Sequence, residues 1–97
     1  MLRSNMFSRQ IRGIYLTHLI ELLSNEYYVK HTLMLKDAGY SSTDLQIMKG
    51  NVERKTLSDK RTDRLENYLI ERYGGVLERH VPSDELEFIK FVQSISK

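Results

Sequence analysis

The chain has 97 residues, of which 40% are hydrophobic and 29% charged, and its formal net charge is +2 at pH 7. This length and composition predict one globular domain, residues 1–97, with a single modest core, and they exclude a largely disordered chain. Because cysteine is absent, a disulfide framework, a thiolate zinc site and a cysteine nucleophile are excluded as well.

The charge is unevenly distributed along the chain. Residues 27–61 carry seven Lys or Arg against four Asp or Glu, whereas residues 62–97 carry five against seven. The middle is therefore basic and the tail acidic, although a solvated surface can show such an asymmetry by chance. No apolar run approaches the roughly 20 residues of a membrane span, and none follows the first basic residues as in a secretory signal. We therefore expect a soluble, cytoplasmic protein without a membrane partner.

The first half of the chain predicts three helices. With one proline and five glycines in the whole chain, an all-helical fold is favoured. Apolar residues at three- and four-residue steps predict a largely buried helix from Ser8 to Ser24, followed by a break at residues 25–27. A second helix is expected over about 29–38, closed by Gly39, and a third over about 42–49, with Leu45 and Met48 directed inward.

The second half predicts two more helices. Residues 50–58 are polar and basic with no period, which is typical of a loop. Ser58 is a suitable N-cap for a fourth helix through Tyr73, which Gly74-Gly75 is expected to end. A fifth helix, about 83–95, has an acidic start followed by six apolar residues. The predicted fold class is all-α, a five-helix bundle.

The sequence contains no pattern that is typical of an enzyme. His18, His31 and His80 lie far apart and lack partners at metal-ligand spacing. The glycines do not form a phosphate-binding loop, and no strand is predicted that could present a nucleophilic serine. We therefore expect no catalytic activity, no cofactor, no metal and no small-molecule ligand.

The stretch AGYSSTDLQIMKG, residues 38–50, is similar to a helix-turn-helix. A rigidly held second helix requires an apolar residue before the turn, a residue that tolerates positive φ in the turn, and two inward apolar residues three positions apart. Ala38, Gly39, Leu45 and Met48 meet these requirements in order. Here the chain resembles the λ-repressor-like helix-turn-helix family of phage repressors, Cro proteins and plasmid regulators. The resemblance covers about residues 11–73 and places the motif at about 29–49.

The resemblance implies a role for eight polar residues. At the start of the second helix, Ser42 and Thr43 match positions that contact bases and phosphates in the family. Gln46 could read adenine, and Lys49 could reach guanine or phosphate. Asp44 could accept from cytosine, cap the helix or repel the backbone. The full set of expected DNA-binding residues is His31, Thr32, Ser42, Thr43, Gln46, Lys49, Arg54 and Lys55.

The family prefers a small residue four positions before the turn glycine, where its two helices cross closely, and this chain has Leu35. Two explanations stay open, a wider helix crossing or an ordinary corner of an all-α protein. Because a single helix-turn-helix reads few base pairs, members of this class usually act as symmetric dimers. The last helix, about 83–95, has more apolar residues than one stripe needs. A dimer interface is expected there through Phe88, Phe91, Val92 and Ile95, the alternative being that the helix simply covers the bundle.

The sequence thus predicts a small regulator of phage, plasmid or similar type, which binds double-stranded DNA as a homodimer and is nucleoid-associated when bound. One alternative is a helical adaptor, inhibitor or antitoxin whose last helix docks into a partner protein. Another is an RNA-binding helical protein.

Overall fold

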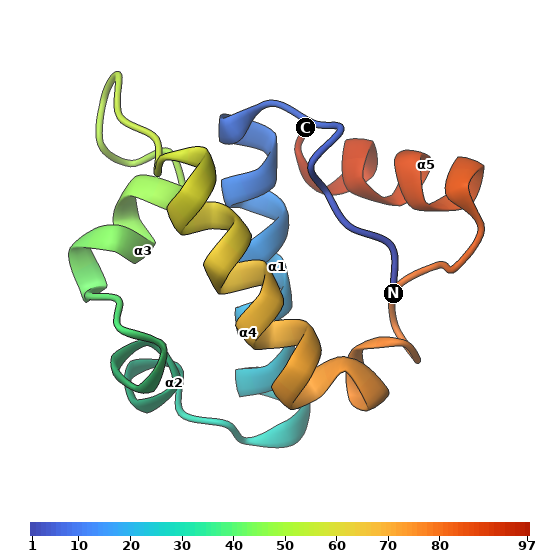
Figure 1. The fold of residues 1–97 in the computed structure, drawn as a ribbon, viewed down its shortest axis with the longest axis horizontal. Coiled ribbons are helices and arrows are strands. Elements are labelled where there is room, and N and C mark those ends of the chain that lie inside the picture. The colour runs from blue at the N-terminus through green and yellow to red at the C-terminus, as the bar shows by residue number, and fades with distance from the viewer.

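The computed structural model describes all residues from Met1 to Lys97 as five helices with no strand (Figure 1). The all-helical prediction is confirmed. None of the helices combines the length and apolarity needed to cross a bilayer. In chain order the helices are α1 (Arg9–Tyr27), α2 (His31–Ala38), α3 (Ser42–Met48), α4 (Asp59–Leu77) and α5 (Glu85–Ile95).

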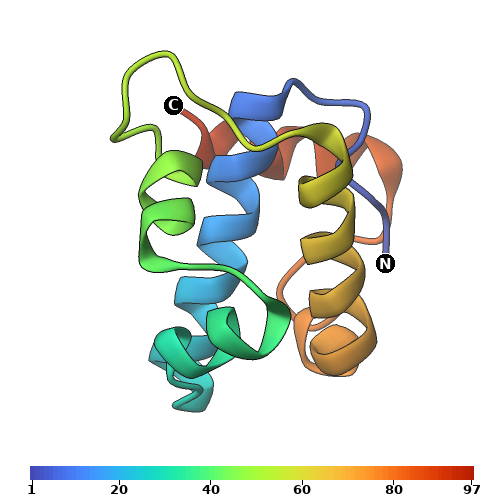
Figure 2. The same cartoon turned by 60° about the vertical axis from the view of Figure 1, so that its left-hand side comes forward.

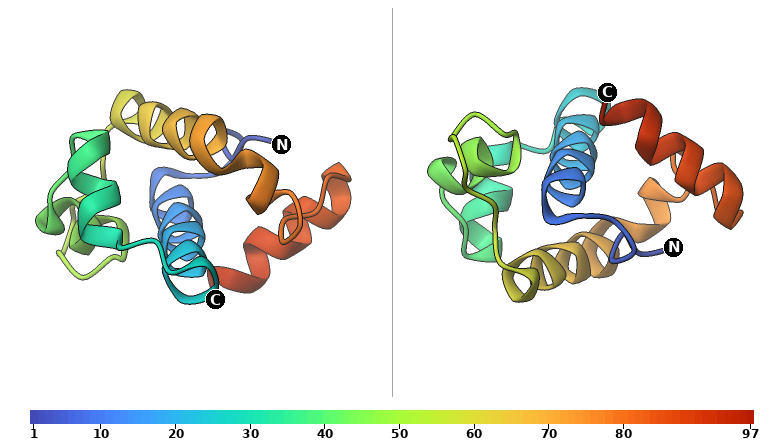
Figure 3. Two further views of the ribbon diagram at one scale, coloured as in Figure 1. Left: turned by 90° about the horizontal axis from the view of Figure 1, so that it is seen from below. Right: turned by 90° about the horizontal axis from the view of Figure 1, so that it is seen from above.

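Helix α1 is the centre of the molecule. Seen nearly end-on in Figure 3, it has α3, α4 and α5 around it, and all four other helices pack against it. Its apolar residues are not confined to one stripe, so it buries more than one face. Leu16, Ile20 and Leu23 are completely buried. The sequence prediction of a helix buried over much of its girth agrees with this position.

Helix α3 approaches α1 closely at Gly13. A Cβ atom built on Gly13 would lie 2.8 Å from the backbone oxygen of Met48 and 3.1 Å from its Cα atom. A real Cβ atom does not come this close to backbone atoms, so only glycine at position 13 allows the backbones of α1 and α3 to lie in contact. Leu35, which stands where the resembled family prefers a small residue, is instead a buried core residue of α2. The tight helix crossing of this fold is therefore between α1 and α3.

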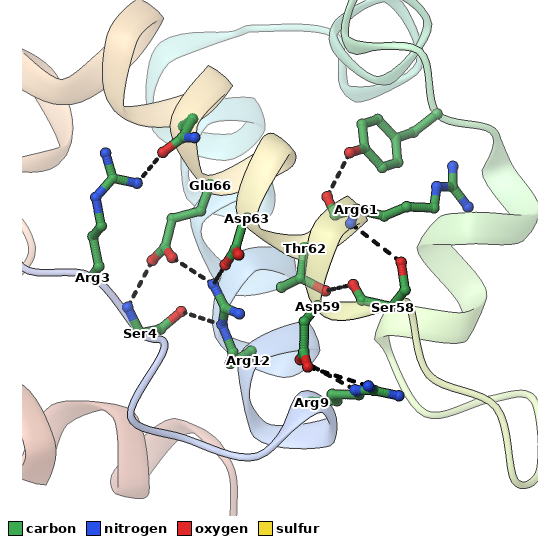
Figure 4. A network of polar contacts seen from close by, with 12 residues as sticks. Arg3, Ser4, Arg9, Arg12, Ser58, Asp59, Arg61, Thr62, Asp63 and Glu66 are labelled. Carbon is green, nitrogen blue, oxygen red and sulfur yellow. Dashed lines mark hydrogen bonds and ion pairs between the residues drawn. The ribbon is translucent and has the colours of Figure 1, made fainter.

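A buried ion pair joins α1 to α4 (Figure 4). The Arg12 side chain is 3% exposed and its Nη2 donates to Glu66 Oε1 at 2.9 Å, while Glu66 is 2% exposed. Arg12 Nε also donates to Ser4 Oγ at 3.1 Å, and the Ser4 backbone N–H donates to Glu66 Oε2 at 2.9 Å. Asp63 adds a second acceptor for Arg12 at 2.8 Å. Since an unpaired buried charge is strongly destabilising, these contacts hold both helices and the N-terminal segment in register.

Helix α1 continues through the residues predicted to break it. Tyr27 is its last residue, and the turn comes at Tyr28, which has a left-handed backbone with φ of 58°. The Tyr27 hydroxyl hydrogen-bonds His80 Nε2 at 2.8 Å, and the two rings pack edge to face. The extra turn is therefore supported by a contact with the distant α4–α5 connection, which no local pattern reveals.

The prediction that Gly74-Gly75 ends the fourth helix is wrong. Helix α4 runs on to Leu77, and Glu78 is its C-cap. Glycine in a helix costs about 1 kcal/mol relative to alanine, which does not by itself stop a helix. Leu77 is completely buried, so the additional turn places an apolar side chain in the core and offsets that cost.

Helix α5 begins as predicted, with the Asp84 side chain accepting from the Glu87 backbone N–H at 3.1 Å. Two residues of the expected dimer interface, Phe88 and Val92, are completely buried inside the single chain. They are therefore not available for a contact between copies in this fold. Phe91 and Ile95 are half-buried, and the Phe91 ring lies edge to face with His18 at 5.8 Å. Dimerisation itself stays a prediction.

Replacing Gly13 with alanine tests the close crossing. The added methyl group would meet the Met48 backbone, which cannot yield without moving α3. We expect Gly13→Ala to lower the free energy of unfolding by about 1–3 kcal/mol, measured by urea denaturation, although alanine is the better helix former.

Gly75→Ala is the matched control, because nothing lies within 4 Å of a Cβ atom at that helical position. It should raise the free energy of unfolding by up to about 1 kcal/mol. Equal stabilisation by the two substitutions would show that α1 and α3 are not in backbone contact.

Candidate nucleic-acid interface

The turn between α2 and α3 is held by backbone and side-chain hydrogen bonds. Gly39 has a φ of 87°, in the left-handed region that glycine adopts most easily, and it ends α2 as predicted. The next residue, Tyr40, is only 8% exposed, and its hydroxyl donates to the backbone oxygen of Arg61 in α4 at 2.6 Å. The turn is therefore tied to α4.

A capping box starts α3. The Asp44 backbone N–H donates to Ser41 Oγ at 3.2 Å, and the Ser41 backbone N–H donates to Asp44 Oδ2 at 2.9 Å. This reciprocal pair satisfies two backbone donors that the first turn leaves free. Ser41 is the N-cap and Ser42 the first helical residue. Of the three roles considered for Asp44, the structure shows helix capping.

Arg61 of α4 binds the same carboxylate from the other side. Its two terminal nitrogens donate to Asp44 Oδ1 and Oδ2 at 2.9 and 3.0 Å, and its guanidinium lies 4.8 Å from the Tyr40 ring centroid. The hydrogen bonds from Arg61 are the main reason that the pKa of Asp44 lies below its ordinary value of 3.8. A bidentate pair is directional, so it sets the orientation of α3 against α4.

Two buried side chains anchor the inner side of α3, and its polar side faces solvent. Leu45 and Met48 are 6% and 3% exposed, as the motif spacing predicted. Ser42, Thr43 and Gln46 are exposed on the outer side. Because Leu45 and Met48 face the core and the turn between α2 and α3 is short, none of the other helices covers the polar side of α3 (Figure 2).

Five of the eight predicted DNA-binding residues line one surface cleft between α2 and α3. The cleft has a volume of about 380 Å³, and no Asp or Glu lines it. Its only ionisable lining groups besides Tyr40 are His31, Lys36 and Lys49. The predicted residues in it are His31, Thr32, Ser42, Gln46 and Lys49.

Two of these side chains already have partners within the chain. Gln46 Oε1 accepts from Asn51 Nδ2 at 2.7 Å, which orients the amide and leaves the Gln46 NH₂ group free to donate. Lys49 Nζ lies 3.6 Å from Glu21 Oε1, with the carboxylate 55% exposed. An exposed pair of this length is weak, so Lys49 can exchange Glu21 for another anion.

The remaining predicted residues lie outside this cleft. Thr43 is exposed on α3 but does not line it, and Arg54 and Lys55 are exposed in the loop that joins α3 to α4. That loop arches over the start of α1 (Figure 2). Arg54 and Lys55 line a second cleft there, of about 280 Å³, together with Arg9. The loop charges are thus separate from the α2–α3 cleft.

Sequence reasoning missed two parts of this surface. Lys36 lines the cleft, and a signal for it existed, because Lys36 follows Thr32 by four residues and so shares a face of α2. The support of Asp44 by Arg61 had no signal, because the two residues are 17 positions apart in the sequence and meet only when α3 and α4 pack.

No group of three or more His, Cys, Asp or Glu side chains is placed to hold a metal ion. The three histidines lie in different surroundings. His18 packs against Phe91, His80 hydrogen-bonds Tyr27, and His31 is exposed at the start of α2. The polar chemistry of the α2–α3 surface is suited to binding an anion or a base edge.

Replacing Asp44 with asparagine tests how α3 is held. The change weakens both the cap and the pair with Arg61, so we expect the free energy of unfolding at pH 7 to fall by about 0.5–2 kcal/mol. The pKa of Asp44 is lowered in the folded state. The Asp44 carboxylate therefore contributes fully to the free energy of unfolding above its ordinary pKa of 3.8, and this contribution is lost as the pH falls through the lowered pKa. The difference between the wild type and Asp44→Asn should therefore shrink below about pH 4 in urea denaturation series.

Asp59→Asn is the matched control, because the Asp59 carboxylate pairs with Arg9 at the surface, where the two side chains are 63% and 55% exposed. It should cost clearly less stability than Asp44→Asn. An equal loss in both variants would contradict a special role for the Asp44–Arg61 pair.

Comparison with known proteins found no relative of this chain. No family model, no curated protein and no solved structure matches it.

Proposed function

We propose that this chain is a small sequence-specific DNA-binding regulator that reads duplex DNA with the exposed side of α3. The observation that carries the proposal is the α2–α3 surface, where five of the residues that the family resemblance implied line one cleft without a carboxylate. Phosphate contacts from α2 would position the protein, and side chains of α3 would contact base edges.

The dimensions of α3 suit the major groove. An α-helix with its side chains is about 10–12 Å across, which fits the roughly 12 Å width of the major groove of B-DNA, and the seven residues of α3 form about two turns. The capping box, the Asp44–Arg61 pair and the close contact at Gly13 hold this short helix in a defined orientation. A rigid mount is required, because side chains that read bases must keep a fixed position relative to the groove.

The charge of the surface supports binding to a phosphate backbone. Lys36 and Lys49 border the cleft, and Arg54 and Lys55 add positive charge at the separate loop cleft, which Glu53 also lines. Each phosphate that is neutralised releases counterions, which makes the affinity fall steeply as salt increases. Occupation of an operator would then regulate transcription, with more than one copy of the chain needed for tight binding.

Selection of binding sequences from random duplexes tests the proposal most directly. It should return one preferred motif, and fluorescence anisotropy on that duplex should show an affinity that decreases steeply with salt. No enrichment above the starting pool, at any salt concentration, would contradict the proposal.

Gln46→Ala tests base reading by α3. The free NH₂ group of Gln46 can donate to a base edge, so its loss should weaken binding to the preferred duplex by about 1–3 kcal/mol and relax the preference at one base pair. Gln93→Ala on the exposed side of α5 is the control and should leave binding unchanged. Unchanged binding by Gln46→Ala would show that this is not the reading side.

Lys55→Ala tests the loop. Because Lys55 is expected to contact a phosphate, the substitution should weaken binding to all duplexes alike and reduce the slope of log K against log salt by about one. Lys90→Ala, on exposed α5, is the control and should keep the wild-type slope. A loss of affinity for only one sequence would instead place Lys55 at a base.

Two alternative functions are distinguished by the same measurements. A helical adaptor or antitoxin that docks an apolar surface into a partner protein shows little salt dependence. An RNA-binding protein would prefer structured or single-stranded RNA over duplex DNA in a competition experiment.

A further inference from the structure

A shallow apolar cleft lies on the other side of α2, away from the α3 surface. It has a volume of about 370 Å³ and is formed by the connection between α1 and α2, by α2 and by the second half of α4. It shares no lining residue with the α2–α3 cleft. Tyr68 and Tyr73 line it together with two basic residues, Lys30 and Arg72, and one carboxylate, Asp37, which is already paired with Arg72.

Two of the four large hydrophobic side chains that the fold leaves exposed line this cleft. Tyr28 is 88% exposed and Leu33 is 61% exposed, whereas every other apolar residue of α2 is buried or half-buried. Single exposed hydrophobic residues are common, but neighbouring ones around a cleft are typical of an interaction site. Burying both would recover apolar area that the isolated chain leaves in water.

The backbone of Tyr28 caps α1, with its N–H donating to the Leu23 oxygen, but its side chain adds little to the stability of the isolated chain. Its φ of 58° lies in the left-handed region, which costs a non-glycine residue free energy and which glycine adopts more easily. Its ring makes little contact within the chain, as its exposure shows. A tyrosine that is both strained and exposed is better explained by a contact with another molecule.

The other side of the molecule carries a surface of complementary character. Leu86, in the first turn of α5, is 69% exposed. Three carboxylates surround it in the sequence, from Asp84, Glu85 and Glu87. We call residues 84–87 the acidic corner. It presents one apolar side chain within negative charge.

We propose that a second copy of this chain occupies the cleft, with Leu86 of its acidic corner packed against Tyr28 and Leu33. The basic residues fit this partner. Lys30 has no ion pair within the chain, and Arg72 is 60% exposed although it lies 3.2 Å from Asp37. Both can therefore pair with the carboxylates of residues 84–87, as the basic middle and acidic tail of the chain suggest.

The positions of the two surfaces decide the kind of assembly. Helix α2 and the start of α5 lie on opposite sides of the molecule (Figure 1), so a chain cannot fill its own cleft. Two copies joined in this way each leave one surface free. The contact is heterologous, and it continues to further copies as a ring or a filament rather than stopping at a symmetric pair. It needs no DNA, and it leaves the exposed side of α3 uncovered.

Sedimentation of the full chain over a range of concentrations, in low and in high salt, tests this association. The wild type should form species larger than a dimer as its concentration rises, and salt should weaken them because charged pairs contribute. A chain that stays monomeric at every concentration, or that stops at a dimer, would overturn the proposal.

Two substitutions remove one surface each without threatening the fold. Leu86→Ala removes the apolar contact of the acidic corner. Tyr28→Gly removes the exposed ring and also the backbone strain, because glycine adopts the left-handed conformation easily. Each should weaken association by about tenfold or more, with an unchanged or higher melting temperature. Met6→Ala is the control, because Met6 is the remaining exposed large hydrophobic residue, at 52% exposed, and lies in neither surface. Wild-type association of both test variants would overturn the proposal.

A mixture of the two variants identifies the geometry. Tyr28→Gly chains keep the acidic corner, and Leu86→Ala chains keep the cleft, so together they should form one-to-one pairs that grow no further. Pairs of this kind would support the head-to-tail contact, and a mixture that associates no better than either variant alone would contradict it.

Discussion

The structure depends on the burial of α1 among all the other helices. A helix in this position must be apolar on several sides, and its remaining residues must meet special conditions. Arg12 is tolerated because Glu66, Asp63 and Ser4 provide its partners. Gly13 is required because α3 comes within contact distance of the α1 backbone. Adjacent residues of one helix therefore fix the positions of α4 and α3 separately.

The candidate interface follows from that arrangement. Helix α3 is too short to be stable alone, so its orientation comes from tertiary contacts. Met48 presses its backbone against Gly13 at one end, and Asp44 is bound by Arg61 at the other. Holding both ends inward leaves the polar side of α3 exposed, and this is the property that the proposed DNA reading requires.

The two edges of α2 have different chemistry, and this gives the molecule two separate surfaces. His31, Thr32 and Lys36 face α3 and form a polar, basic cleft. Tyr28 and Leu33 lie on the opposite side with Tyr68 of α4 and form an apolar one.

By itself the sequence determined the all-helical class and the approximate extent of the helices, because apolar spacing and capping residues act locally. Gly39, Ser41 and Asp84 mark helix ends through contacts within a few residues. Local signals failed where distant groups decide, as at Tyr27, held by His80, and at Leu77, buried beyond two glycines. Only the tertiary structure decided that Phe88 and Val92 belong to the core and that Arg61 orients α3. Which apolar or charged groups become partners depends on how helices pack, and spacing along one helix does not contain that information.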